Sequence, residues 1–350
     1  MKLEKPVLLA IVALVTVAAA ASGYYGYELW KEGQPLEVKT GDFVEMYYIG
    51  YLENETVFAS SFSDQTDVTV DTPFHENATN ATLTLFKAYV GEGRPSRYPP
   101  GWTSSSLGRI VGARLGDLPG LRKGLLGMQE GQEKTIGPLS PENAYGLPVE
   151  EGITFTTDFA GVDQEFMILN VTDGNLTLTW MPVIGEKFTL PMFWGEEPIP
   201  NPYWVWSNAT EVTNMTETEA TILTTPNRLS DLTLYPFWEN TTEATYNETT
   251  ISLTTTPEVG LNFTYYGAVY TVENVTADII NISIQYGNQT YYQDVNRTMS
   301  FPRTMTITRI FEDIPQQQLQ QDLQAAGYST GEMAGKTVYF RVHLVNIHRL

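Results

Sequence analysis

The chain contains no cysteine, so neither disulfide bonds nor thiol chemistry contributes to its fold or its function. Histidine is nearly as scarce, because His75, His343 and His348 are the only three and lie too far apart in the sequence to suggest a metal cage. Basic residues are also few: 20 lysines and arginines stand against 41 aspartates and glutamates. The net charge of −21 argues against nucleic acid or anionic lipid as a partner. We therefore expect no metal, no cofactor and no nucleic-acid partner.

Charged residues are also missing from a long stretch near the N-terminus. Residues 6–22 are mostly apolar, and four aromatic side chains follow within the next eight residues. About 20 helical residues cross a hydrocarbon core of about 30 Å, aromatic residues gather at its edge, and lysines favour the cytoplasmic side. We expect a cytoplasmic stub at 1–5 and a transmembrane anchor at 6–26, which makes the chain a single-pass membrane protein with an extracytoplasmic bulk. The alternative is a signal peptide cleaved near residues 19–22, which would leave a secreted protein.

Acceptor sequences for N-glycosylation recur beyond this stretch, as expected of an exported glycoprotein. They begin at Asn54, Asn77, Asn80, Asn170, Asn175, Asn208, Asn214, Asn240, Asn247, Asn262, Asn274, Asn281, Asn288 and Asn296. A chain rich in threonine also produces such triplets by composition alone, so the alternative is that they carry no glycan.

The most informative stretch of the sequence is 124–146. Its first part predicts a short apolar helix that ends in a glycine reversal at Gly131, followed by a strand from Glu133. A bend that starts at Pro141 then presents Tyr145 beside a glycine. The stretch holds no nucleophile with a base and no phosphate-binding loop. A function based on it must therefore come from shape and apolar surface.

Several motifs, in this order along the chain, together resemble the FKBP-type peptidyl-prolyl isomerases. The central ones are Leu118-Pro-Gly-Leu121, Gly124-Leu-Leu-Gly-Met128, Gly131, Glu133-Lys134 and Pro141-Glu-Asn-Ala-Tyr-Gly146. The segments at 39–50 and 57–61 resemble the opening strand and the corner of that family, and the segment at 335–347 resembles its closing strand.

The closing strand is separated from the other motifs by more than 180 residues. A sheet without it would leave a central pairing position empty. We therefore expect the fold class α+β, mostly antiparallel β: an FKBP-like half-barrel with one short helix, interrupted by a large β-rich insertion and preceded by the transmembrane helix. The expected boundaries are 37–158 for the first part of the FKBP-like domain, 159–330 for the insertion and 331–350 for the closing strand.

Within the insertion, a pattern of the form Trp-x-Asn-x-Thr-Glu-x-Thr occurs at 206–213 and 238–245, and a related segment occurs at 273–278. A run rich in β-branched residues follows each of them. This predicts repeated hairpins, arranged as one or two modules that resemble the chaperone domain inserted in the flap of some FKBPs. Chance similarity in a threonine-rich segment is the alternative. Leu319 and Leu323 are spaced four residues apart, which predicts a helix over 315–326.

The resemblance implies an apolar site for the proline ring. Carried over by position, its lining consists of Tyr48, Phe58, Leu118, Leu121, Tyr145 and Phe340. The main-chain amide of Leu118 and the hydroxyl of Tyr145 would hold the substrate. Leu121 replaces a frequent tryptophan, and Ala59 replaces the acidic residue that follows the phenylalanine in the family. Each lining residue, taken alone, is more typical of an ordinary core.

The sequence thus predicts a peptidyl-prolyl cis-trans isomerase and folding chaperone for exported proteins at the outer face of the membrane. Its partners would be unfolded or Xaa-Pro-containing polypeptides, together with the membrane through the N-terminal helix. Clients would meet exposed aromatic surface in the insertion, unless these side chains form its core: Phe193, Trp194, Trp204, Trp206 and Trp238. The irregular segment 91–101 is either a substrate-contacting loop or a surface excursion. The alternative function is a catalytically inactive FKBP-like binding protein.

Overall fold

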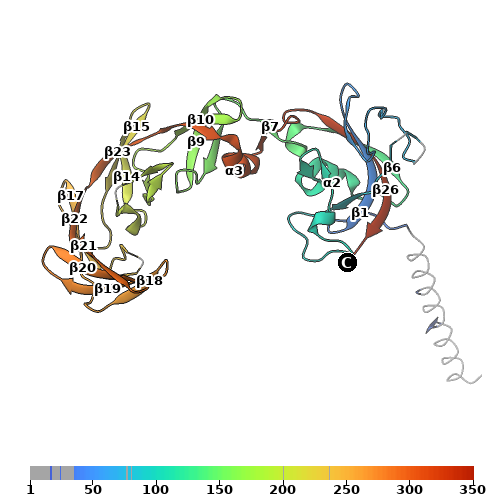
Figure 1. The fold of residues 1–350 in the computed structure, drawn as a ribbon. Coiled ribbons are helices and arrows are strands. Elements are labelled where there is room, and N and C mark those ends of the chain that lie inside the picture. The colour runs from blue at the N-terminus through green and yellow to red at the C-terminus, as the bar shows by residue number, and fades with distance from the viewer. Residues whose placement is uncertain are drawn as a thin grey trace, which may run out of the picture. The chain divides into compact units, whose positions relative to one another are not determined.

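A computed structural model describes residues 16, 17, 24, 35–75, 78, 79, 81–199, 201–235 and 237–350. The chain divides into two compact units, one made of Met1–Leu147 with Gly331–Leu350 and the other of Pro148–Thr330. Figure 1 shows the strands and helices of each unit.

A five-stranded antiparallel sheet is the centre of the first unit. Its order is β2-β1-β26-β6, and β3 pairs with β1 beyond the end of β2. The strands are β1 (Phe43–Leu52), β2 (Val57–Ser60), β3 (Phe86–Tyr89), β6 (Glu133–Leu139) and β26 (Val338–His348). The last strand lies between β1 and β6, so the two ends of the unit's sequence meet in the middle of one sheet.

Strand β26 shows why this sheet has a dry face. Val338, Phe340, Val342 and Leu344 alternate with partly exposed residues and are each fully buried. Alternation with a period of two sends them all to one face. The helix α2 (Pro119–Leu125) packs on that face with Leu121 and Leu125.

Short elements connect the strands of the first unit. They are the 3-10 turns η1 (Ser104–Ser106), η2 (Leu115–Asp117) and η3 (Pro141–Asn143) and the small hairpin of β4 (Arg109–Ile110) and β5 (Ala113–Arg114).

Among its described residues, the second unit has four antiparallel sheets of three or four strands and one small two-stranded sheet. Going up the chain, each of the four larger sheets receives one hairpin in turn: β9 (Gln164–Val171) with β10 (Asn175–Trp180), β14 (Thr210–Met215) with β15 (Glu219–Thr224), β16 (Thr242–Tyr246) with β17 (Thr250–Thr255), and β19 (Ala268–Val275) with β20 (Ile279–Tyr286).

The chain then returns along the same four sheets in reverse order. The returning strands, which we call the return ribbon, are β21 (Gln289–Asn296), β22 (Thr298–Pro302), β23 (Thr304–Thr308) and β24 (Ile310–Pro315). They pair with β20, β17, β15 and β10 respectively. The first three sheets are therefore each built from a local hairpin and a strand that comes from far along the sequence, whereas in the fourth sheet β21 follows β20 directly.

Smaller elements complete the sheets and the connections. They are β7 (Leu147–Pro148), β8 (Thr154–Thr157), β11 (Lys187–Phe188), β12 (Phe193–Trp194), β13 (Glu197–Pro198), β18 (Asn262–Tyr265), β25 (Tyr328–Ser329), η4 (Tyr203–Val205), η5 (Gln316–Leu319) and α3 (Gln320–Ala325).

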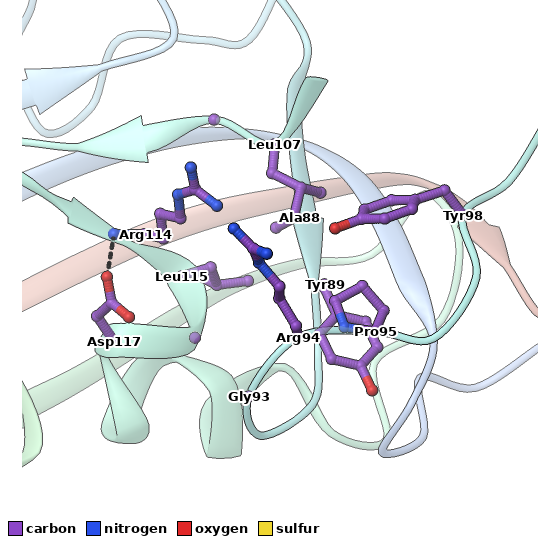
Figure 2. A pocket seen from close by; sticks show the side chains of 12 residues that line it. Ala88, Tyr89, Gly93, Arg94, Pro95, Tyr98, Leu107, Arg114, Leu115 and Asp117 are labelled. Carbon is purple, nitrogen blue, oxygen red and sulfur yellow. Dashed lines mark hydrogen bonds between the residues drawn. The ribbon is translucent and has the colours of Figure 1, made fainter. Parts of the chain in front are cut away.

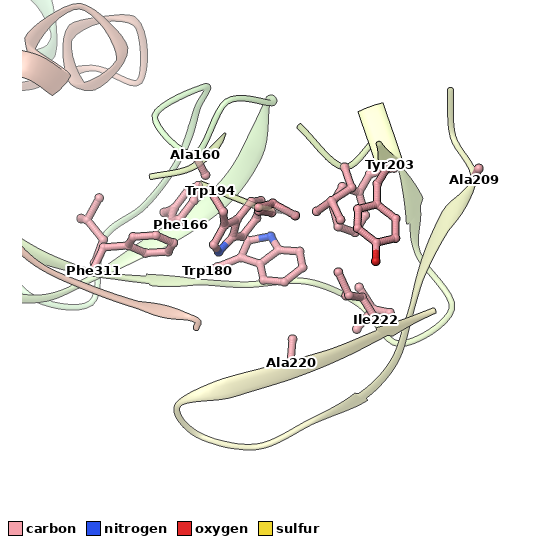
Figure 3. Close-up of a cluster of buried hydrophobic side chains, with 14 of the residues drawn as sticks. Ala160, Phe166, Trp180, Trp194, Tyr203, Ala209, Ala220, Ile222 and Phe311 are labelled. Atoms are coloured by element: carbon pink, nitrogen blue, oxygen red, sulfur yellow. The ribbon is translucent and has the colours of Figure 1, made fainter. Parts of the chain in front are cut away.

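One large apolar core runs along most of the second unit. Trp180, Trp194 and Trp206 lie in it. Figure 3 shows Trp180 and Trp194 with Phe166 and Phe311 on the same side of the core. Trp180 and Trp194 meet edge to face with ring centroids 4.7 Å apart. Large aromatic rings of this kind bury much of the apolar area of a fold.

The predicted fold class is wrong. Strands make up 45% of the structure and helices 10%, so the described chain is a β-rich fold of many sheets rather than α+β. Among the described residues no helix is long and apolar enough to cross a membrane. The α-helices α2 and α3 span seven and six residues, about 10 Å each at 1.5 Å per residue. The transmembrane helix predicted at 6–26 lies outside the described residues, apart from residues 16, 17 and 24.

Two local predictions in the second unit can be compared directly with the structure. The predicted helix over 315–326 is shorter, because a 3-10 turn at Gln316–Leu319 precedes an α-helix at Gln320–Ala325. The first two repeats, at 206–213 and 238–245, each lead into the first strand of a hairpin, and Asn208 and Asn240 share a positive φ there. The third segment, at 273–278, instead crosses a hairpin turn, so its alignment with the other two was wrong.

Candidate functional site

An aromatic cluster forms where β1, β2 and β26 meet. The Phe58 and Phe340 rings lie edge to face with centroids 5.8 Å apart, and Gly50 lies beneath both. A Cβ on Gly50 would stand 2.8 Å from the Phe58 ring and 2.9 Å from the Phe340 ring. Only glycine therefore permits this close approach of the two rings to β1.

Tyr48 extends the cluster along β1. Its ring meets Phe86 edge to face at 5.0 Å and lies 6.5 Å from Phe340. Its main-chain amide donates to the hydroxyl of Ser61 at 3.0 Å, and the amide of Ser61 donates back to the Tyr48 carbonyl at 2.9 Å. These reciprocal bonds fix the strand at the point where the tyrosine enters the core.

The helix α2 supplies the floor of the cluster. Pro119 occupies its first turn, where a missing N–H costs nothing, and Gly124 lets it approach the sheet until a Cβ would collide with Ile136. Leu118 and Leu121 are fully buried against the same core as Tyr48 and Phe340.

Tyr145 closes the cluster from the bend after β6. The turn at Pro141–Asn143 and the positive φ of Gly146 direct the tyrosine back toward the sheet. Its ring meets Phe58 edge to face at 5.9 Å, and its hydroxyl donates to the carbonyl of Ile110 at 3.4 Å. Tyr145 and Phe58 are half-buried, so this side of the cluster reaches the surface.

All six predicted site residues thus lie in the first unit and in one apolar cluster. Only two of them, Tyr48 and Tyr145, carry titratable groups. Burial raises the pKa of Tyr48 to about 12. Burial also raises the pKa of Tyr145, and the neighbouring Tyr48 adds to that rise. Both hydroxyls therefore stay protonated at neutral pH and can only donate or accept hydrogen bonds.

Two groups expected to bind the substrate, the Leu118 amide and the Tyr145 hydroxyl, already form hydrogen bonds within the chain. The main-chain amide of Leu118, expected to hold a substrate carbonyl, already donates to the carbonyl of Leu115 at 3.1 Å. The reason is local: η2 ends at this residue, and its last turn takes up the amide. The Tyr145 hydroxyl is likewise engaged, although its 3.4 Å bond to Ile110 is long.

Ala59 is buried in the core beneath the cluster, opposite Gly50 on β1. A methyl group therefore stands where the resemblance implies a carboxylate. This keeps the site apolar and leaves it without a charged group.

The first unit also has a concavity whose lining is separate from the aromatic cluster; Figure 2 shows the residues that line it. It is shallow, because its enclosed volume of about 60 Å³ is far below the usual range for ligand sites. The lining comes from the end of β3, the segment after it and η2: Ala88, Tyr89, Gly93, Arg94, Pro95, Tyr98, Leu107, Gly108, Arg114, Leu115, Gly116 and Asp117. This lining contains none of the six predicted site residues, but Asp117 immediately precedes Leu118 in the sequence.

Sequence reasoning missed Phe86, Gly50 and Ile110. Phe86 and Gly50 stand in strands with the expected alternation, and a glycine in a strand interior is itself a signal of close approach by another group. Ile110 gave no such signal, because its contact with Tyr145 depends on how the segment after β3 folds.

The aromatic residues of the insertion are mostly core. Trp194, Trp206 and Trp238 are buried, Trp204 is half-buried, and Phe193 alone of the five is exposed. Within the described part of the chain, no three His, Asp or Glu side chains are placed to hold a metal ion.

The chain is similar to FK506-binding protein 2 of Yarrowia lipolytica, with 26% identity over 136 residues. The match covers 37% of this chain and 66% of that protein. No protein-family model matches the chain. The chain thus has a distant FKBP-type relative over about a third of its length.

Proposed function

We propose that the first unit is a peptidyl-prolyl cis-trans isomerase. The observation that carries the proposal is the aromatic cluster of Tyr48, Phe58, Tyr145 and Phe340, which has an apolar floor and one side open to solvent. The distant similarity to an FK506-binding protein supports the same reaction class.

The reaction needs no acid or base. Rotation about an Xaa-Pro bond faces a barrier of about 18–20 kcal/mol that comes from amide resonance. The planar amide is more charge-separated than the twisted one, so an apolar surface that excludes water favours the twisted form. Lowering the barrier by about 4–6 kcal/mol would accelerate rotation by about three to four orders of magnitude.

The residues divide this work between them. The half-buried Phe58 ring is the surface offered to the proline, and the fully buried Phe340, Leu118 and Leu121 support that ring and keep water from beneath it. Tyr145 exchanges its long bond to Ile110 for one to a substrate carbonyl. A bond of 3.4 Å is easily replaced by a shorter one.

The test is isomerisation of a blocked Ala-Leu-Pro-Phe peptide by the full chain. Phe58→Ala removes one wall of the cluster, so we expect kcat/KM to fall at least about tenfold. Phe74→Ala is the matched control, because Phe74 is also a half-buried ring but packs on Tyr47 in a separate cluster. Equal activity of the unaltered chain and Phe58→Ala would contradict the proposal.

A second candidate function is binding of apolar polypeptide without catalysis. Ala59 in place of a carboxylate and the occupied amide of Leu118 favour it. In that case the full chain binds the Leu-Pro peptide, Phe58→Ala weakens binding, and neither protein accelerates isomerisation.

We further propose that the second unit holds unfolded clients. The fourth sheet exposes five tyrosines, each more than half accessible: Tyr265, Tyr266, Tyr286, Tyr291 and Tyr292. Replacing Tyr266, Tyr286 and Tyr292 by serine should weaken suppression of client aggregation. The Val183→Ser and Ile184→Ser pair, exposed on another part of the unit, is the control.

We also propose that the protein acts outside the cytoplasm. The lack of cysteine suits an oxidising exterior. Asn170, Asn214 and Asn274 are exposed acceptors at the same place in three hairpins, directly after a β-bulge and before the turn. A mass decrease on treatment of the native protein with an N-glycosidase would support this location, and an unchanged mass would count against glycosylation.

A further inference from the structure

The segment between β3 and α2 reverses the charge of the chain locally. Residues 91–117 hold the arginines 94, 97, 109 and 114 and only two acidic residues, Glu92 and Asp117. In the whole chain acidic residues outnumber basic ones about two to one. A basic excursion in an acidic protein indicates a local need for positive charge.

Two of these arginines are paired unfavourably with each other. In the β4–β5 hairpin Arg109 lies directly opposite Arg114. Like charges opposite each other on neighbouring strands destabilise a hairpin. Among the described residues neither guanidinium has an ion pair. The Asp117 carboxylate accepts the main-chain amide of Arg114 at 2.9 Å, and Glu92 pairs with Arg122 at 3.2 Å.

The hairpin turn carries a second cost. Val111 has a φ of +34° and Gly112 one of +83°, the combination of a tight turn that favours Asn-Gly. A β-branched residue with positive φ is strained, and Val111 is also 44% exposed. Strain that persists in a surface turn points to a function of that turn.

The hairpin lies at the edge of the aromatic cluster. Ile110, between Arg109 and Val111, accepts the hydroxyl of Tyr145 through its carbonyl. On the other side, Arg114 lines the concavity of Figure 2 together with Arg94 and Tyr98. The hairpin therefore places positive charge next to the aromatic cluster and along the concavity.

We propose that Arg109, Arg114 and Arg94 bind the side-chain carboxylate of an aspartate or glutamate close to the substrate proline, so that the protein prefers acidic prolyl segments. The inference rests on the proposed isomerase function. A guanidinium matches a carboxylate in shape and in hydrogen-bond donors, and a bound carboxylate would also relieve the repulsion between Arg109 and Arg114.

The test uses a set of Leu-Pro peptides blocked at both ends. Each peptide carries glutamate or glutamine at a single position, either before or after Leu-Pro. We expect glutamate to raise kcat/KM about two- to fivefold over glutamine at one or more positions at low salt, as for a partly exposed ion pair. The ratio should approach one at high salt. A glutamine peptide with a free C-terminal carboxylate tests whether a terminal carboxylate can replace the side-chain one. We expect its kcat/KM to equal that of the same peptide with a blocked C-terminus.

Two variants locate the effect. R109Q with R114Q should bring the glutamate-to-glutamine ratio to about one, and it removes the unfavourable pair, so the hairpin should not lose stability. Arg97→Gln is the matched control, because Arg97 lies in the same segment but neither lines the concavity nor belongs to the β4–β5 hairpin. It should keep the ratio of the unaltered chain.

A ratio of one in the unaltered chain, or a ratio that survives in the double variant, overturns the proposal. If the glutamine peptide is not isomerised at all, the isomerase function fails, and calorimetric Kd values then test the carboxylate site alone. A Kd about two- to fivefold lower for the glutamate peptide supports the site, and equal Kd values overturn it.

Discussion

Two hydroxyls are the only titratable groups among the six residues of the proposed proline site. Tyr48 and Tyr145 are both held neutral by burial, which raises their pKa values above the ordinary 10. At neutral pH the site therefore acts through its apolar surface and its hydrogen bonds.

This leads to a prediction about pH. The kcat/KM for a neutral Leu-Pro peptide should be flat between about pH 6 and pH 9, because no residue of the site changes its charge there. Initial rates in the peptide assay across that range, corrected for the uncatalysed reaction, provide the measurement. A bell-shaped profile would show that an acid or base takes part.

Asp42 shows how a single buried carboxylate ties the end of the chain to the sheet. Burial by itself would raise its pKa, but hydrogen bonds from Arg349 and from the Lys39 amide outweigh burial and lower it. The Arg349 guanidinium donates to both carboxylate oxygens, at 2.8 and 2.6 Å.

A lowered pKa means that this contribution to stability is present above the unfolded value of about 3.9 and is lost as pH falls through the folded value. Asp42→Asn should therefore reduce the free energy of unfolding by about 1–2 kcal/mol at pH 7 and by much less near pH 2. Denaturant titrations at the two pH values measure this. Asp64→Asn is the control, because Asp64 is exposed and its carboxylate accepts hydrogen bonds from Thr66 alone among the described residues. An equal loss of unfolding free energy at both pH values for Asp42→Asn would contradict this explanation.

At the residue scale, the sequence predicts which side chains converge better than it predicts their hydrogen-bond partners. The side chains of Phe58, Tyr145 and Phe340 converge because strand alternation and the proline bend already determine where they point. The Leu118 amide was assigned to the substrate, but its partner depends on whether a 3-10 turn ends there. Hydrogen bonding within a connecting turn depends on backbone angles that residue type only weakly restricts.

Among the elements, the return ribbon has a regular construction. Arg297, Arg303 and Arg309 stand six residues apart, one at each step between neighbouring strands. The main-chain amide of each arginine donates to a carbonyl in the hairpin turn of one sheet. The main-chain carbonyl of the same arginine accepts a hydrogen bond from an amide at the end of a strand in the neighbouring sheet. Their side chains bond to the same two regions, so every arginine links two successive sheets.

Arg303 gives the clearest test of this arrangement. Its guanidinium donates to the carbonyls of Thr224 and Asn247 at 3.1 and 2.9 Å and to the Thr225 hydroxyl at 2.8 Å. Arg303→Gln should lower the free energy of unfolding of the second unit by about 1.5–3 kcal/mol. Arg228→Gln, which loses one exposed bond to Ser230, should change it by under about 0.5 kcal/mol. Chemical denaturation followed by tryptophan fluorescence measures both changes. Equal effects of the two substitutions would show that the Arg303 hydrogen bonds between sheets do not contribute specially to stability.

The hairpins of the second unit could be predicted from sequence, but the ribbon could not. A hairpin joins neighbouring strands, so its alternation and its turn lie within about 15 residues. The ribbon pairs β24 with β10, which are about 135 residues apart, and pairing over such a distance leaves no local pattern. The arginine spacing of six is the one signal that was present and unused.

For the whole molecule, charge is distributed very unevenly. The second unit, Pro148–Thr330, has 23 acidic and 5 basic residues, a net charge of −18. The first unit has 18 acidic and 15 basic residues, a net charge of −3. Self-repulsion opposes compaction, and salt screens it.

Salt should therefore stabilise the second unit and leave the first almost unchanged. Five of the seven tryptophans lie in the second unit, so their fluorescence follows its unfolding. Between about 0.05 and 0.5 M NaCl we expect the fluorescence midpoint to rise by about 2–4 °C per kcal/mol gained. Thermal loss of the isomerase activity that we propose for the first unit should shift less. A fluorescence midpoint that stays constant or falls would contradict this view of the charge.

The central claim is that the aromatic cluster of the first unit speeds rotation of a prolyl bond. Its most direct measurement is the exchange rate between the cis and trans signals of a Leu-Pro peptide by NMR, with the full chain present at a small fraction of the peptide concentration. The account predicts exchange within seconds or faster for the unaltered chain and for Phe74→Ala, and slow exchange, over tens of seconds, for Phe58→Ala. Exchange at the uncatalysed rate in the presence of the unaltered chain would contradict it.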